Sequence, residues 1–133
     1  MSFSHPALEL ANDKTLVFTA LSKKFFYFRL HIVKYVLEQN CVPLNPFTSF
    51  DYFLLDTVPR DVVRSANNTL VERVDELWVF GDISDGVLAE IKQVKAQGKP
   101  IRYFRIVQSQ MIEPISSAEV VFEADVPAIH EAL

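Results

Sequence analysis

The chain has 133 residues, of which 50% are hydrophobic and 23% charged, a composition that is ordinary for one folded domain with its own apolar core. Its formal net charge of −4 argues against the basic surface that binds DNA or RNA, so we expect no nucleic-acid polymer as a partner. A single cysteine excludes an intramolecular disulfide. We expect no signal peptide, because the first residues are acidic and polar, and no membrane-spanning helix, because no run of about 18 apolar residues is present. We therefore expect a cytoplasmic protein with no membrane partner.

The first part of the chain predicts a strand, a helix and a second strand after a leader. Residues 1–14 have no regular period and form this leader. Residues 15–20 are β-branched and aromatic, which is typical of a strand. Residues 25–39 repeat apolar side chains at helical spacing. Residues 41–44 predict a short strand near an edge of the sheet, because Pro43 cannot donate to a strand ladder.

The rest of the chain alternates helices with strands after a long loop at residues 47–58, and long loops in compact domains are often functional. Helices are predicted at residues 59–74 and 86–97 and from residue 126, and strands at residues 77–80, 101–106 and 119–122. Residues 107–133 would thus add a last strand and a short helix. This β-α-β alternation predicts one domain over residues 1–133, with a parallel sheet and helices on both faces.

The segment 75–90 carries most of the functional information. A short apolar strand runs into a Gly-Asp-Ser loop and then into a helix, the place where open α/β sheets bind ligands. Gly86 leaves space for a ligand, and Ser84 can cap the helix or donate to a bound oxygen. Glu90 lies one turn into the helix at the border of its apolar face. The helix dipole favours an anion there, so we expect Glu90 to be ionised.

The heptapeptide Ser84-Asp-Gly-Val-Leu-Ala-Glu90 resembles the Ser/Asp-x-Gly-x-x-x-Glu signature of the nucleoside 2-deoxyribosyltransferase superfamily and of the related deoxynucleoside-monophosphate N-glycosidases. The resemblance covers roughly residues 15–106 and is specific within 75–100. It implies a flavodoxin-like or Rossmann-like three-layer sandwich with a mostly parallel sheet of four to five strands. It also implies an enzyme that acts on a nucleoside or nucleotide, needs no cofactor and forms a homo-oligomer.

In that superfamily the glutamate is the nucleophile that forms a covalent glycosyl ester. The resemblance therefore implies that Glu90 attacks the sugar, and that Asp82 and Ser84 hold sugar hydroxyl or phosphate oxygens. The turn Leu21-Ser-Lys-Lys24 departs from the family, because it is bulkier and basic where members carry a small Gly- or Pro-containing turn. Ser22 and Lys23 either grip a phosphate there or close the turn.

Further candidates for the site come from the loop at residues 47–58 and from the helix that follows it. Asp51 or Asp56 is a candidate to read the edge of a base while Phe47 or Tyr52 stacks on it. Arg60 is a candidate phosphate ligand or, together with Asp61, part of the charge pattern of a helix start.

Each of these interpretations has a simpler rival. Glu90 could be a solvated surface residue, and Trp78 belongs in the core rather than in a stacking site, because its strand should be buried on both faces. The aromatic run 25–28 is expected in the core and at a subunit interface rather than on a membrane. The three histidines and Cys41 are too scattered for a metal site.

Three classes of function remain open. The first is an enzyme that cleaves or transfers at an N-glycosidic bond, the second is a nucleotide-sensing module without chemistry, and the third is an assembly protein that keeps only the fold.

Overall fold

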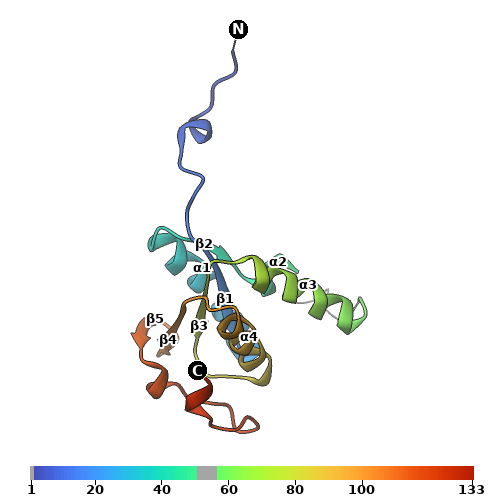
Figure 1. Ribbon diagram of the computed structural model, residues 1–133. Helices are drawn as coiled ribbons and strands as arrows, with labels where there is room; N and C mark the ends of the chain where they lie inside the picture. The colour runs from blue at the N-terminus through green and yellow to red at the C-terminus, as the bar shows by residue number, and fades with distance from the viewer. Residues whose placement is uncertain (1, 51–56) are drawn as a thin grey trace.

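The computed structural model describes residues 2–50 and 57–133, which form an α/β fold around a five-stranded sheet (Figure 1). The strand order is β2-β1-β3-β4-β5; the first four strands run parallel and β5 runs antiparallel to β4. The strands are β1 (Leu16–Leu21), β2 (Val42–Leu44), β3 (Glu76–Phe80), β4 (Ile101–Val107) and β5 (Met111–Ile115). The order 2-1-3-4-5 is that of flavodoxin-like folds, so the predicted fold class is confirmed.

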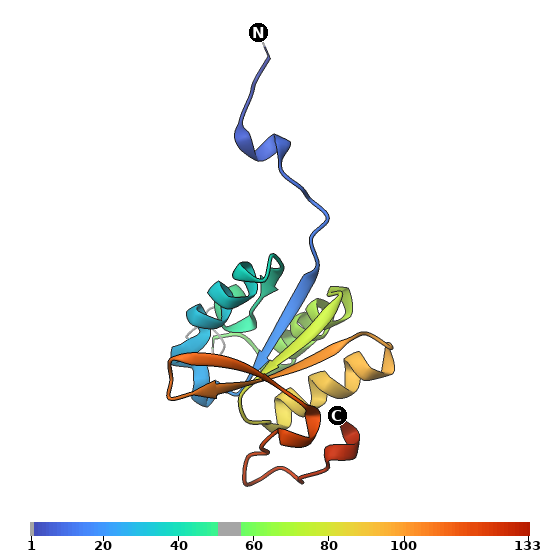
Figure 2. The ribbon, with the colours of Figure 1, turned by 90° about the vertical axis from the view of Figure 1, so that its left-hand side faces the viewer.

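Helices cover both faces of the sheet, with α1 on one side and α3 and α4 on the other (Figure 2). The short helix α2 lies between β2 and α3 in the chain. The α-helices are α1 (Arg29–Glu38), α2 (Pro46–Ser49), α3 (Arg60–Arg73) and α4 (Asp85–Ala96), and the 3-10 helices are η1 (Pro6–Glu9), η2 (Lys23–Phe28), η4 (Ser117–Glu119) and η5 (His130–Ala132). In both views the N-terminal segment that carries η1 projects from the body.

Side chains that alternate along the strands form two apolar layers, one on each face of the sheet. On β3, Leu77 and Val79 face the layer under α3 and α4, whereas Trp78 and Phe80 face the layer under α1. Trp78 is 3% exposed and its ring centroid lies 5.3 Å from that of Phe104, which confirms the prediction that it belongs to the core. Both faces of the central strands are therefore sealed, and only their ends are free to build a site.

Three local predictions were wrong. Residues 119–122 do not form a strand; Glu119 is the last residue of η4, and Phe122 makes only a single parallel bridge with Ile83. The fifth strand is β5, which was missed because Pro114 interrupts its pattern; proline is tolerated there because β5 is an edge strand. The expected terminal helix is reduced to η5, and the predicted helix 25–39 begins as the 3-10 helix η2.

Among the described residues, no helix combines the length and the apolar character needed to cross a bilayer. The predicted loop 47–58 begins within α2, and its residues 51–56 lie outside the described part of the chain.

Candidate functional site

A cavity of about 820 Å³ opens where the parallel strands end. Its wall includes Leu21 and Ser22 from the end of β1, and Ser84 and Gly86 from the start of α4. Side chains of α2, of α3 and of the C-terminal segment complete it. In a sheet of order 2-1-3-4-5, ligands bind between the ends of β1 and β3, because the connections from these two strands leave toward opposite faces.

The start of α4 is organised by its own side chains. Ser84 is the N-cap, and its Oγ accepts a hydrogen bond of 3.3 Å from the amide of Val87. The Asp85 carboxylate accepts from the amide of Gly86 at 2.7 Å. Because these bonds satisfy free amides of the first turn, they fix where α4 begins and thus where Glu90 lies.

Glu90 lines the cavity from α4 and is half-buried. The Nδ2 of Asn67, on α3, donates to its Oε2 at 2.7 Å. Within residues 2–50 and 57–133, no lysine or arginine forms an ion pair with Glu90, and no group donates to its Oε1. The carboxyl group is therefore positioned by one amide and is not neutralised by a cation.

Burial raises the pKa of Glu90 to about 7, and the hydrogen bond from Asn67 opposes this rise without cancelling it. The expectation that the helix dipole keeps Glu90 ionised was wrong, since loss of hydration around the carboxylate outweighs the dipole. At neutral pH the group is divided between its protonated and ionised forms.

Asn67 was not predicted as a site residue. Its Oδ1 is buried and has no hydrogen-bond partner among the described residues, so the amide is held in the cavity wall chiefly by Glu90. The sequence feature that could have indicated a functional role for Asn67 was the pair Asn67-Asn68 in the interior of a helix, where asparagine is unfavourable.

Most predicted site residues reach the cavity. Phe47 and Arg60 join Ser22, Lys23, Ser84, Gly86 and Glu90 in its wall. A Cβ added at Gly86 would meet no atom within 4 Å, so this position does leave room beside the backbone.

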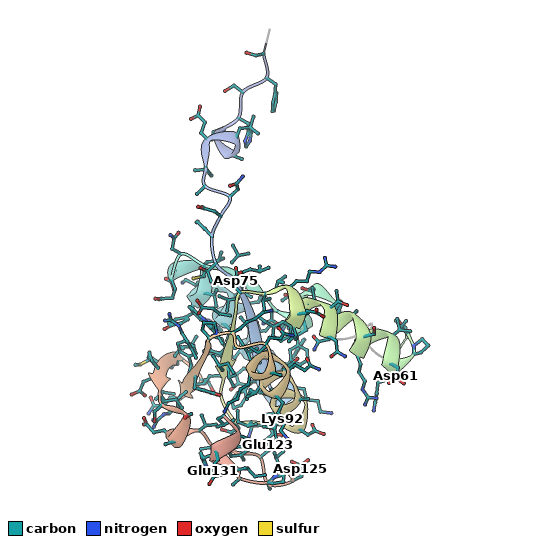
Figure 3. All side chains as sticks on the ribbon, in the orientation of Figure 1. Asp61, Asp75, Lys92, Glu123, Asp125 and Glu131 are labelled. Atoms are coloured by element: carbon teal, nitrogen blue, oxygen red, sulfur yellow. The ribbon has the colours of Figure 1, made fainter. Side chains whose placement is uncertain are left out.

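Of the other two predicted residues, one does not line the cavity and one cannot be placed. Asp82 does not line the cavity, because Lys24 draws its carboxylate into an ion pair at 2.5 Å. Asp56 lies outside the described residues. The sequence also missed Glu123 and Asp125, which line the cavity from the C-terminal segment and are labelled in Figure 3.

Asp75, before β3, lies at the other end of the sheet from Glu123 (Figure 3). Its carboxylate accepts a hydrogen bond of 2.8 Å from the amide of Leu16, so it ties β1 to β3 rather than serving the site. No three histidine, cysteine, aspartate or glutamate side chains in the described part of the chain are grouped to hold a metal ion.

The pKa of Glu90 predicts how stability depends on pH. The unfolded chain releases this proton near pH 4.5, but the folded protein keeps it until about pH 7. Proton binding by Glu90 therefore contributes fully to the free energy of unfolding below pH 4.5, and this contribution is lost as the pH rises to about 7. In Glu90→Gln no buried carboxyl group has to ionise, so the free energy of unfolding of the variant should exceed that of the wild type by about 3 kcal/mol at pH 8 and by little at pH 4.5. Urea unfolding across this range measures the difference, and a gap that does not change with pH would contradict it.

Comparisons with known proteins agree with this architecture. No curated protein matches the sequence. A solved structure, the 2-desoxiribosyltransferase from Leishmania mexicana, has a similar fold, with a TM-score of 0.55 and 15% sequence identity. The match covers 70% of this chain and 65% of that one, so this chain spans less than two thirds of the transferase's length. The model of the family described as "Domain of unknown function (DUF7768)" matches residues 23–104, more than half of the sequence, and the chain belongs to that family.

Proposed function

We propose that the protein cleaves or transfers at the N-glycosidic bond of a nucleoside or nucleotide, with Glu90 as the nucleophile. The observation that carries this proposal is the Glu90 carboxyl group, which borders an open cavity and has no cation partner among the described residues. A carboxylate that served only the fold would be paired with a cation or directed to solvent. The fold shared with a deoxyribosyltransferase adds support.

The chemistry follows from the two carboxylate oxygens. Asn67 occupies Oε2, so Oε1 is the oxygen available to attack the anomeric carbon of the sugar. A C–O ester bond forms, the C–N bond breaks, and its electron pair leaves with the base, which takes up a proton. A second base or a water molecule then attacks the same carbon and loses a proton, and the ester C–O bond breaks so that its electron pair returns to the Glu90 carboxylate.

Other residues of the wall would hold the substrate. Ser84 and Ser22 offer hydroxyl groups to the sugar, Gly86 leaves room for it, and Phe47 offers an apolar ring to the base. Lys23 and Arg60 supply positive charge at the cavity for a phosphate, if the substrate is a nucleotide. We retain Asp56 as a proposed contact for the edge of the base.

A nucleotide-sensing module is the second candidate, and the withdrawal of Asp82 into an ion pair favours it. Such a module would be stabilised by a nucleoside or nucleotide in thermal unfolding without releasing free base.

We also propose that the chain forms a homo-oligomer, because Leu30 and Leu37 are 61% and 58% exposed on α1. Sedimentation as a monomer at micromolar concentration would contradict the oligomer.

Removing the nucleophile should abolish the reaction. We expect Glu90→Ala and Glu90→Gln to lower the rate of base release by at least about a thousandfold, since no covalent ester can form. Each deoxynucleoside and its monophosphate is incubated with the protein, with and without an acceptor base, and free base is measured by chromatography. Glu38→Gln, on the exposed surface of α1, is the matched control and should react like the wild type. Rates that survive in the Glu90 variants would end the assignment.

Asn67 should control the pH dependence of the reaction. Since Glu90 must be ionised to attack, kcat/KM should rise with pH through about 7. Asn67→Ala removes the hydrogen bond that lowers the Glu90 pKa, so the rise should move to higher pH and activity should recover in alkaline buffer.

Asn68→Ala is the matched control, because Asn68 Oδ1 accepts a hydrogen bond of 3.0 Å from Gln93 Nε2 and no hydrogen bond joins this side chain to Glu90 in the described part of the chain. Its pH profile should keep the wild-type midpoint. A uniform loss of rate in Asn67→Ala, with an unchanged midpoint, would show that Asn67 does not act through the Glu90 carboxyl group.

A further inference from the structure

The C-terminal segment forms part of the cavity wall because its backbone is attached to the loop between β3 and α4. The amide of Ile83 donates to the carbonyl of Val121 at 2.8 Å, and the amide of Glu123 donates to the carbonyl of Ile83 at 2.9 Å. This pair of hydrogen bonds fixes the backbone of Glu123 beside the ends of the strands.

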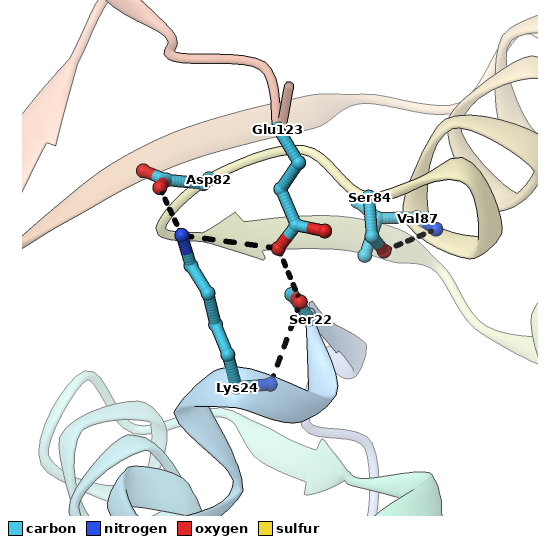
Figure 4. Close-up of polar contacts among 6 residues, drawn as sticks. All are labelled: Ser22, Lys24, Asp82, Ser84, Val87 and Glu123. Carbon is cyan, nitrogen blue, oxygen red and sulfur yellow. Dashed lines mark hydrogen bonds and ion pairs between the residues drawn. The ribbon is translucent and has the colours of Figure 1, made fainter. Parts of the chain in front are cut away.

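The side chain of Glu123 then reaches across to the turn after β1 (Figure 4). Ser22 Oγ donates to Glu123 Oε2 at 2.5 Å, and Lys24 Nζ lies 3.9 Å from the same oxygen. Ser22 is 3% exposed and the Glu123 side chain is 22% exposed, so this contact is largely shielded from water. Ser22 and Lys24 belong to the basic turn that was predicted either to hold a phosphate or to be closed, and a carboxylate of the chain itself contacts it.

The local charge balance opposes a second anion. Lys24 is shared between Glu123 and Asp82, so one ammonium group faces two carboxylates. Asp125 adds a further acidic side chain to the cavity wall. A phosphate placed here would meet the Glu123 carboxylate, and Lys24 would already be paired with two carboxylates, whereas a hydroxyl group could donate a hydrogen bond to a Glu123 oxygen.

We propose that Glu123 is a specificity-determining residue, which occupies the anion position at Ser22 and Lys24 and makes the cavity select a nucleoside, with its uncharged sugar hydroxyl, over the corresponding 5′-monophosphate. This inference rests on the proposed function for the identity of the ligand. Lys23, Arg60 and Arg64, which also line the cavity, are the cations that would favour the opposite preference.

The test compares the binding of deoxynucleosides and of their 5′-monophosphates by calorimetry in the full chain. In the wild type, the nucleoside should bind at least tenfold more tightly. Glu123→Ala opens the position and should lower this ratio at least tenfold, chiefly by strengthening binding of the monophosphate. Glu123→Gln keeps the size and can still accept from Ser22, so it should shift the ratio in the same direction with less risk to the fold. Thermal unfolding confirms that each variant is folded.

Glu131→Gln is the matched control, because it removes the same charge from the same C-terminal segment at a residue outside the cavity wall (Figure 3). Its ratio should equal that of the wild type. A wild type that binds both ligands equally, or an unchanged ratio in folded Glu123→Ala and Glu123→Gln, would overturn the proposal.

The outcomes also separate this inference from the proposed reaction. Base release by the wild type with no change of ratio in the Glu123 variants would retain the enzyme and reject the role of Glu123. A shifted ratio without base release in any variant would retain the role of Glu123 and reject the enzyme. No binding of either ligand to any variant would reject both.

Discussion

Asn67 and Glu90 come from the two helices that cover one face of the sheet, and the hydrogen bond between them is the contact on which the proposed chemistry depends. The amide holds one carboxylate oxygen and supplies no charge, so it orients Glu90 without neutralising it. Burial raises the cost of ionisation until the carboxyl group titrates near neutrality. A more exposed glutamate would be ionised but poorly oriented, and one paired with a cation would be a weaker nucleophile.

The sheet explains why such a group is found here. Its central strands are covered on both faces, and only their carboxyl ends leave space between helices on opposite sides. The loop after β3 has two tasks at this edge: it caps α4 through Ser84, and it holds the C-terminal segment through Ile83. One short segment thus positions both Glu90 and Glu123, which line the same cavity from separate parts of the chain.

Periodicity in the sequence was sufficient to predict the parallel strands and the helices between them, because burial of one face imposes a pattern on each element. It failed for β5, whose Pro114 is acceptable only at an edge that the sequence does not reveal. The position of Glu90 could be predicted since its cap and its helix are local. Its partner Asn67 is 23 residues away, and the contact between Ser22 and Glu123 spans 101 residues.

Contacts of such separation depend on the packed structure and leave no local pattern. The same reason accounts for two errors about charge. Ionisation of Glu90 was inferred from its own helix, whereas its pKa is set by burial in the folded protein, where α3 packs beside α4. Asp82 was assigned to the site through the resemblance to the transferase superfamily, whereas its carboxylate forms an ion pair with Lys24 from the turn after β1.

The central claim, that Glu90 becomes covalently bonded to the sugar, is tested most directly by the mass of the protein after rapid acid quenching with a deoxynucleoside in the absence of acceptor base. The account predicts an intact mass increased by one deoxyribosyl group, located on the peptide that contains Glu90 and absent in Glu90→Gln. Base release by the wild type with no adduct at any quench time, or with an adduct on another residue, would contradict it.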